Sequence, residues 1–472
     1  MHRLAASTTG RWFYRGKEIS PESHHGLTHL LSNICDDLYV HTPRLWNELI
    51  NRRGLSSQGA AARRNLLERM LLNADQEDLG IEKYPPERSM YDSILKAGGL
   101  HRHRRDGKWE FSSVSREDPI NLSPTWQMIS EYIFSDKPEP HSIDGLYKIL
   151  SCPPYGLTEG VLPVILCAFL IVNHGETTLY QEGTLLPEPT VANWELLLRR
   201  PELFMVAGCK VTGTRMAIIE RFANRFNVEP MVMPVVRTLI RGITSLPEHT
   251  KRTNRLSKQA LAVRITLEQA RSPEQLLFVD LPAAVDMPPF EHRRIITKQV
   301  EIFFERLNRA LTELVNEMPK LLAWGRDELL TACGIEAGDD GWSSFRTIST
   351  ELITHTSNNG LLPLLKRASE TTDSLSALES VLAYIANRPP KSWADIDTDR
   401  FLEQVKILGN LYQAAHQGYF TSTDLTPEQQ ERSQEVAEDI WQYLKYQYDD
   451  DPEVLKAALQ IMIQRYQSKK DQ

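Results

Sequence analysis

Cysteine is scarce in this sequence, and its spacing excludes the sites that cysteines usually build. The 472 residues include five cysteines, which lie far apart and contain no CxxC pair. This spacing predicts neither a zinc site nor a disulfide framework. Free cysteines fit a reducing compartment, so we expect a cytoplasmic protein. The five are Cys35, Cys152, Cys167, Cys209 and Cys333.

Long apolar runs are missing as well. Residues 1–10 contain no apolar stretch of the length that a signal peptide needs. The most apolar run extends only from Val161 to Val172, whereas a membrane-spanning helix needs about 20 such residues. We therefore expect no membrane partner, and we predict that 161–172 is a helix of the protein core.

The motifs of the common enzyme classes are also absent. No GxSxG or HExxH motif occurs. Gly208 and Gly213 have the spacing of a phosphate-binding loop, but Thr214 stands where that loop requires a lysine. The segment therefore predicts a strand-to-helix turn. We expect no ATP hydrolysis, no cofactor and no catalytic residue, and an active site assembled from distant residues is the weakest alternative.

Histidines do not predict a metal site either. His24, His25 and His29 could share one face of a helix, but no Asp, Glu or Cys at ligand spacing completes a metal-binding set. A surface cluster is the simpler interpretation. His101 and His103 lie in a basic segment, and we expect both to face solvent.

The net charge of −8 argues against a chain devoted to nucleic acid, although a local basic face would be compatible with it. Three stretches are locally basic, within 52–69, 102–108 and 237–264. The second and third carry few acids, so they are the better candidates for phosphate contacts without sequence preference. Solvated side chains or salt bridges are the alternative. The candidate nucleic-acid-binding residues are Arg102, Arg104, Arg105, Lys108, Arg237, Arg241, Lys251, Arg252 and Arg255.

Local patterns predict a mainly α fold with small β-hairpins. Ser56 and Ser57 can cap a helix over 58–72. Asp106–Gly107 lies between two short runs, which is a hairpin signal, and Glu182–Gly183 repeats it farther along. Helical periodicity dominates after about residue 233 and includes one apolar stripe over 295–314. The sequence thus predicts two winged-helix-like units followed by an irregular helical bundle.

Several details of this fold are specific enough to check. Pro43 sits where a first-turn proline would, before a predicted helix over 45–53. Leu100, Trp109 and Phe111 should anchor the first hairpin against the helices. The predicted parts are an N-terminal arm, two winged-helix-like units, two helical domains and a C-terminal helical hairpin. Their bounds are 1–29, 30–120, 121–232, 233–337, 338–424 and 425–472.

Several short segments, spread over about 10–412, carry a family resemblance: Thr42–Arg53, Leu55–Ser57, Ala61–Arg64, Pro154–Leu157, Gly160–Pro163, Leu179–Tyr180, Glu182–Thr184, Leu246–Thr250, Leu277–Phe278, Asp280–Pro282 and Pro389–Trp393. They resemble the region downstream of the ATPase core in large bacterial P-loop proteins of phage-defence islands, the BrxC and PglY type of the BREX systems. The resemblance implies a nucleotide-binding core on the N-terminal side, which this sequence does not contain. ATP hydrolysis therefore does not carry over. Either a partner subunit would supply the ATPase, or the chain would be a shortened relative kept for its binding surfaces.

Two functions follow as hypotheses. The first is a non-catalytic accessory or scaffold subunit of a bacterial antiviral complex, which binds a P-loop ATPase or a second copy of itself. Double-stranded DNA is a further candidate partner. The alternative is a stand-alone winged-helix DNA-binding regulator. Aromatic residues near both ends could anchor a protein partner or cap the ends of the core. They lie in Arg11–Tyr14 and at Trp441, Tyr443, Tyr446 and Tyr448.

Overall fold

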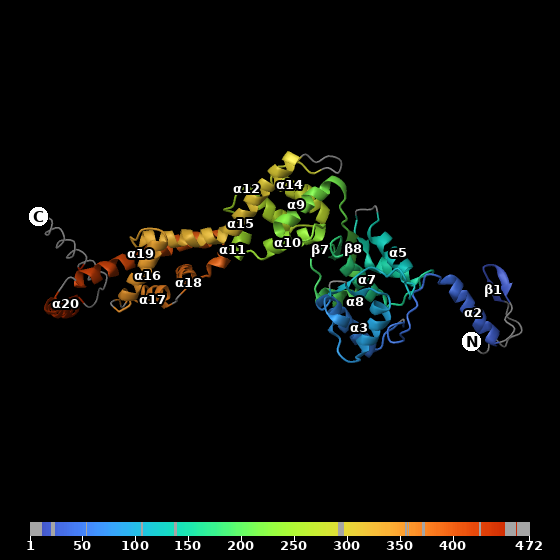
Figure 1. Ribbon diagram of the computed structural model, residues 1–472. Coiled ribbons are helices and arrows are strands. Elements are labelled where there is room, and N and C mark those ends of the chain that lie inside the picture. Colours follow the sequence, from blue (N-terminus) through green and yellow to red (C-terminus); the bar gives the residue numbers. More distant parts are fainter. Residues whose placement is uncertain are drawn as a thin grey trace. The chain divides into compact units, whose positions relative to one another are not determined.

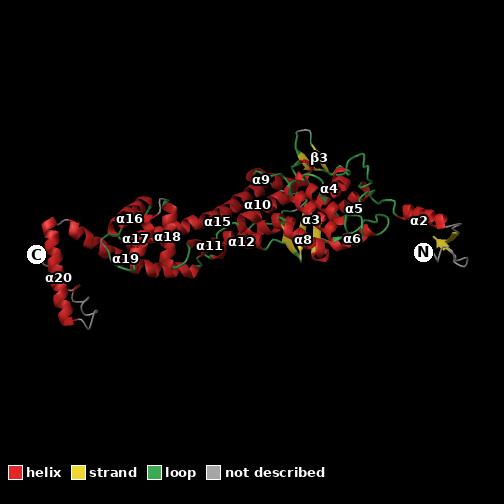
Figure 2. Cartoon of the chain, turned by 90° about the horizontal axis from the view of Figure 1, so that it is seen from below, coloured by secondary structure: helices red, strands yellow, loops and turns green. Residues whose placement is uncertain are grey.

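The structure is a computed structural model that describes residues 12–19, 24–52, 54–104, 107–135, 139–290, 297–354, 356, 358–370, 373–423, 426–448 and 459. These residues form two compact units, coloured along the chain in Figure 1. Unit 1 lies within Met1–Leu246 and Ser257–Thr312, and unit 2 within Pro247–Leu256 and Glu313–Gln472. The mainly helical fold with small antiparallel sheets is confirmed (Figure 2). The finer six-part division stays a prediction.

The first part of unit 1 begins with a hairpin and ends with another. Ser56 caps α3 by accepting a hydrogen bond from the Gly59 N–H at 3.1 Å, as its position predicts. Gly99 has a φ of +65° and follows the last helical turn before β3. In chain order the elements are β1 (Trp12–Tyr14), β2 (Lys17–Ile19), α2 (His24–Leu38), α3 (Ser57–Leu72), η1 (Glu77–Gly80), α4 (Pro86–Met90), the π-helical η2 (Tyr91–Lys96), β3 (His101–His103) and β4 (Trp109–Phe111).

The second part of unit 1 contains its largest sheet. The strand order is β5-β8-β6-β7, and every neighbouring pair is antiparallel. Glu182 and Gly183, with φ values of +50° and +79°, form the predicted tight turn between β6 and β7. The elements are α5 (Ser123–Ile133), β5 (His141–Ser142), α6 (Ile143–Ser151), α7 (Leu162–Val172), β6 (Thr177–Gln181), β7 (Thr184–Leu186), α8 (Val191–Arg199), η3 (Pro201–Leu203) and β8 (Phe204–Gly208).

Helix α7 is the centre of the unit 1 core, as the apolar run predicts. Every residue from Leu162 to Leu170 is buried. The Phe169 ring lies 4.9 Å, centroid to centroid, from that of Trp126 on α5, and α3 and β4 also contact this helix. In the part of the chain that is described, no helix combines the length and hydropathy needed to cross a membrane.

The rest of unit 1 is helical. Val300, Phe303, Phe304 and Leu307 of the predicted apolar stripe are buried, and the Phe304 ring lies 4.6 Å from that of Phe222. The elements are η4 (Gly213–Arg215), α9 (Met216–Phe226), α10 (Val232–Thr244), α12 (Lys258–Glu268), α13 (Pro273–Gln275), η5 (Leu276–Asp280), α14 (Leu281–Ala284) and α15 (Thr297–Ala332), which continues into unit 2.

Unit 2 packs its helices around a second apolar core. Thr253 Oγ1 donates to Asp395 at 2.7 Å, and His249 Nδ1 lies 3.0 Å from the Trp393 carbonyl oxygen, so the short segment 247–256 is fixed to this core. Besides α15 the elements are α11 (Glu248–Arg252), α16 (Asp339–Leu352), α17 (Leu362–Glu370), α18 (Ser374–Ala386), η6 (Pro390–Ser392), α19 (Asp395–Thr423) and α20 (Pro427–Tyr448).

The predicted helix over 45–53 is wrong, because its described residues form turns and bends. Contacts from distant parts of the chain hold the segment in another conformation. The Arg44 N–H donates to the Ile120 carbonyl at 2.7 Å, and the Asn47 side chain accepts the Leu49 N–H at 3.0 Å. Such side-chain bonds to nearby backbone groups compete with helix formation.

Two other details complete the comparison with the sequence. The glycines at the ends of 338–341 predict a loop, but α16 already begins at Asp339. The second helix of the predicted C-terminal hairpin, expected over 452–467, lies outside the described residues except for position 459.

Replacing Trp393 with alanine is expected to destabilise unit 2 by about 3–5 kcal/mol, because a fully buried aromatic side chain would leave a cavity. Its Nε1–H also donates to the Arg388 carbonyl at 2.7 Å. The control is Leu375→Ala, since Leu375 on α18 is 54% exposed. Hydrogen exchange of unit 2 amides in both variants measures the effect. Equal protection in the two variants would contradict the packing of Trp393.

Candidate functional site

The basic hairpin β3–β4 is the first candidate surface. Its strands pair antiparallel with Arg102 opposite Glu110, and the hairpin projects from the body of unit 1 (Figure 2). Arg102, Arg104 and Lys108 are exposed, and Arg104 forms an ion pair with Glu110 at 3.3 Å. Arg105 lies outside the described residues. The hairpin is therefore confirmed, while its role in binding nucleic acid stays a prediction.

The expectation that His101 faces solvent is wrong, whereas His103 is exposed as expected. His101 is only 2% exposed. Its Nε2 lies 3.0 Å from the Ala74 carbonyl oxygen and its Nδ1 lies 3.0 Å from the Tyr91 hydroxyl. The carbonyl can only accept, so Nε2 carries the proton and Nδ1 accepts from Tyr91. Burial lowers the pKa of this imidazole from its usual value, and the hairpin thus has a neutral polar anchor.

The expected apolar anchors surround this histidine. Leu100 is fully buried, and Trp109 and Phe111 are half-buried. The imidazole of His101 stacks on the Trp109 ring at 5.2 Å and lies 4.9 Å from the Phe111 ring. The sequence pattern located these residues correctly, but it did not show that a histidine at the start of a basic strand would point inward.

The basic residues of the third stretch already have protein partners. Arg237 donates to the carbonyl oxygens of Pro187 at 2.8 Å and His174 at 2.9 Å, and burial lowers its pKa. The other four candidate nucleic-acid-binding residues of this stretch form ion pairs, as the salt-bridge alternative expects. The pairs are Arg241 with Glu188, Lys251 with Glu248, Arg252 with Glu248, and Arg255 with Asp399.

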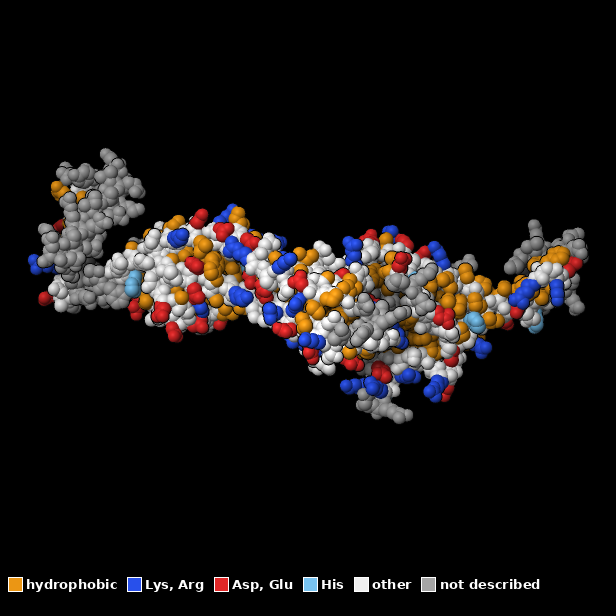
Figure 3. Space-filling view, turned by 90° about the horizontal axis from the view of Figure 1, so that it is seen from above, with side chains coloured by type: hydrophobic (Ala, Val, Ile, Leu, Met, Phe, Trp, Pro, Cys, Tyr) orange, Lys and Arg blue, Asp and Glu red, His pale blue; other side chains and the backbone are white. Residues whose placement is uncertain are grey.

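This pairing lowers the positive potential that a phosphate backbone would meet. On the face shown in Figure 3, Lys and Arg side chains are interspersed with Asp and Glu rather than gathered in one broad patch. A phosphate contact at the third stretch would have to displace existing partners. The hairpin is therefore the better of the two predicted basic surfaces.

The segment with phosphate-loop spacing is a strand-to-helix turn, as predicted. β8 ends at Gly208, and Gly213, with a φ of +71°, opens η4 before α9. Lys210, within the turn, is exposed and lies 3.9 Å from the Glu176 carboxylate. Arg215, which follows the turn, is buried and donates to the Phe290 carbonyl oxygen through Nε at 3.1 Å. Its guanidinium also lies over the Phe278 ring, 4.6 Å from the centroid. This arginine therefore has a structural role within unit 1.

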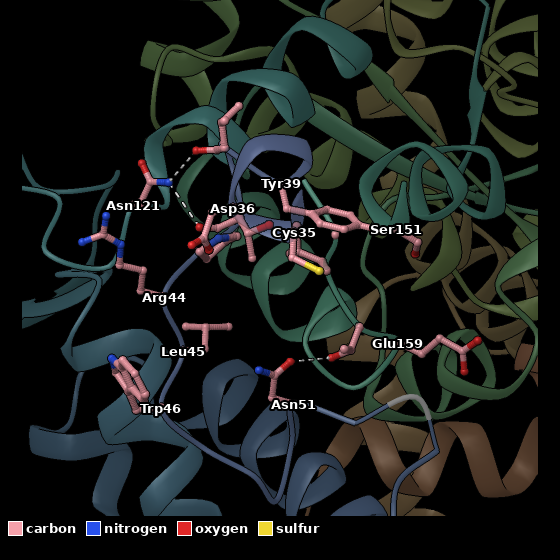
Figure 4. A pocket seen from close by; sticks show the side chains of 16 residues that line it. Cys35, Asp36, Tyr39, Arg44, Leu45, Trp46, Asn51, Asn121, Ser151 and Glu159 are labelled. Atoms are coloured by element: carbon pink, nitrogen blue, oxygen red, sulfur yellow. Dashed lines mark hydrogen bonds between the residues drawn. The ribbon is translucent and has the colours of Figure 1, made fainter. Parts of the chain in front are cut away.

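The sequence did not indicate a large hollow in unit 1, which has a volume of about 970 Å³. It lies where the end of α2 and the segment 42–46 meet the segment 151–159 (Figure 4). Arg44 and Trp46 lie on one side of it, and Ser151 and Glu159 on the other. The lining residues are Cys35, Asp36, Tyr39, Val40, Thr42, Pro43, Arg44, Leu45, Trp46, Asn51, Asn121, Ser151, Gly156, Leu157, Thr158 and Glu159.

Hydrogen bonds between distant residues shape this hollow. The Asn121 amide donates to the carbonyl oxygens of Val40 at 3.4 Å and Thr42 at 3.2 Å, and Thr42 Oγ1 donates to the Tyr155 carbonyl at 2.5 Å. Thr158 Oγ1 donates to Asn51 at 3.4 Å on the far side. The walls are thus held by hydrogen bonds between residues that are up to 113 positions apart in the sequence.

The described residues offer no group of three or more His, Cys, Asp or Glu that could hold a metal ion. The side chains of His24 and His25 lie outside the described part, and His29 contacts Asn33 at 3.2 Å. The five cysteines are free thiols. Cys167, Cys209 and Cys333 are buried, and Cys35 and Cys152 are exposed. Burial raises the pKa of the three buried thiols, which makes them poor nucleophiles.

No protein-family model matches the sequence, and no curated protein or solved structure is significantly similar to it. The function is therefore inferred from the surfaces of the two units and the charges on them.

Unit 1 is expected to lose stability on acidification because of His101. Its pKa is lowered in the folded state, so the unfolded chain, with a histidine pKa of about 6.5, binds the proton more readily. The stabilisation is complete above about pH 6.5 and is lost as the pH falls through the lowered native pKa. Urea unfolding of unit 1 at about pH 7.5 and about pH 5 measures this loss.

The variant His101→Gln should show a smaller difference between the two pH values, since glutamine does not titrate. His103→Gln is the matched control, because His103 is exposed on the same strand. An unchanged pH dependence in His101→Gln would show that the buried imidazole does not limit stability in acid.

Proposed function

We propose that this chain is a non-catalytic accessory or scaffold subunit of a bacterial antiviral complex, which binds a partner P-loop ATPase or a second copy of itself. The observation that carries the proposal is the apolar face of α20. Val436, Ile440 and Tyr443 lie at helical spacing i, i+4 and i+7, and Trp441 follows Ile440 directly in the chain. All four are between 44% and 64% exposed. Exposed aromatic and aliphatic side chains on one helix face favour a protein partner.

The charges of α20 support the same interpretation. Its sequence contains Glu428, Glu431, Glu435, Glu438 and Asp439 but few cations. A polyanion would be repelled by this helix, whereas a protein partner can bury its apolar face. The resemblance to proteins with an ATPase core adds the class of that partner.

The finer fold assignment also belongs to this proposal. The order α5, β5, α6, α7, β6, β7 is helix, strand, two helices and a hairpin, which is typical of winged-helix units. α7 occupies the position of a helix that could enter a DNA groove, yet its residues 162–170 are all buried. β8 is inserted between β5 and β6 in the sheet. These features favour a winged-helix-like unit that holds a structure together over one that reads DNA.

The proposal is tested by the state in which the full chain is isolated. At micromolar concentration it should co-purify with a P-loop ATPase or have the mass of a dimer by light scattering. The double variant Val436→Ser/Ile440→Ser should weaken this association, because it removes apolar surface from α20. The matched control is Val315→Ser, which changes an exposed valine on α15. A monomeric chain without such a partner would contradict the scaffold function.

A DNA-binding regulator is the second candidate, and the exposed Arg102 and Arg104 of the hairpin favour it. Binding to a short DNA duplex should then weaken steeply with salt. Replacing both arginines with alanine should flatten the log–log salt dependence by about 0.9 for each phosphate that the hairpin no longer neutralises. Arg241→Ala is the control, because Arg241 is paired with Glu188. A slope that is equal in all three proteins would exclude the hairpin as the DNA-binding surface.

A further inference from the structure

Trp46 is a highly exposed apolar side chain at the large hollow of unit 1. It is 92% exposed although tryptophan normally buries most of its surface. Tyr39 and Val40, which line the same hollow, are also exposed apolar residues. A tryptophan so placed contributes little to the stability of the fold. Its large apolar surface is available to a ligand, and tryptophan is among the residues that most often dominate binding.

The backbone around Trp46 is fixed on both sides. The Arg44 N–H donates to the Ile120 carbonyl at 2.7 Å. The Asn47 amide donates to Ser93 Oγ at 3.0 Å and its oxygen accepts the Leu49 N–H at 3.0 Å. Binding to a preorganised segment loses less conformational entropy than binding to a mobile loop. The exposed ring is thus held in place before a ligand arrives.

Arg44 supplies a charged group beside the ring. It is exposed, and its guanidinium has no hydrogen bond or ion pair with any residue in the described part of the chain. Asp36 and Glu159 line the same hollow, and Glu48, also exposed, follows Trp46 closely in the chain. The hollow therefore offers one unpaired cation, an aromatic face and carboxylates at its edges.

We propose that this hollow is a docking site for a peptide segment of a protein partner. An apolar side chain of the peptide packs against Trp46, a carboxylate of the peptide pairs with Arg44, and a basic group faces Asp36 or Glu159. These carboxylates would repel the successive phosphates of a nucleic acid, and this charge pattern selects a peptide as the occupant. The inference rests on the proposed scaffold function, because it names a second surface and the chemistry of the partner there.

A library of random peptides displayed on phage, selected on the immobilised full chain, tests this proposal. The enriched peptides should combine an acidic residue with an apolar one. Synthesised singly, they should bind the full chain in fluorescence anisotropy. Trp46→Ala and Arg44→Glu should each weaken binding about tenfold or more, as substitutions at dominant interface residues do. Neither change should lower the melting temperature, because both side chains are exposed.

Matched controls are Leu72→Ala, an exposed apolar residue at the end of α3, and Arg199→Glu, an exposed arginine on α8. Both lie outside the hollow lining and should bind the peptides normally. The proposal is overturned if no peptide is enriched, if Trp46→Ala binds as well as the unchanged chain, or if a single-stranded oligonucleotide binds through Trp46 instead. Association through α20 is measured separately, so these results leave the scaffold function independently testable.

Discussion

Helix α7 has no polar face, and this constraint organises unit 1. Because residues 162–170 are buried on every side, other elements must surround the helix. α3, α5 and β4 contact it, and the rings of Trp126 and Phe169 pack together. Burying one large apolar side chain contributes about 1.5–3 kcal/mol, so this helix is a major source of stability. One of these elements, β4, is also a strand of the basic hairpin.

The polar groups at the candidate surfaces are positioned by a small number of buried or tertiary contacts. His101 connects the hairpin to Tyr91 and to the Ala74 carbonyl, while Asn121 connects the segment 40–42 to the region before α5. The same principle explains the third basic stretch. Arg237 serves two carbonyl oxygens, so a residue that looks like a phosphate ligand in the sequence is used to hold the fold together.

The charged and the apolar side chains on the surface can be compared as candidate binding groups. Most predicted cations that the structure describes outside the hairpin have acidic or carbonyl partners, whereas Trp46 and the face of α20 have large exposed apolar areas. Covering exposed apolar area with a partner favours binding, whereas a cation that is already paired contributes little to the binding of a phosphate. The exposed side chains therefore favour a protein partner over a nucleic acid.

The sequence by itself determined the local elements. Ser56 as a helix cap, Glu182–Gly183 as a tight turn and Val161–Val172 as a core segment each follow from chemistry within a few residues. The tertiary structure decided the orientation of His101, the absence of a helix over 45–53 and the exposure of Trp46. The orientation of His101 and the conformation of 45–53 depend on partners far along the chain, such as Ala74 and Ile120. Local spacing carries no information about such partners, because the free energy of those contacts exists only once the chain has folded.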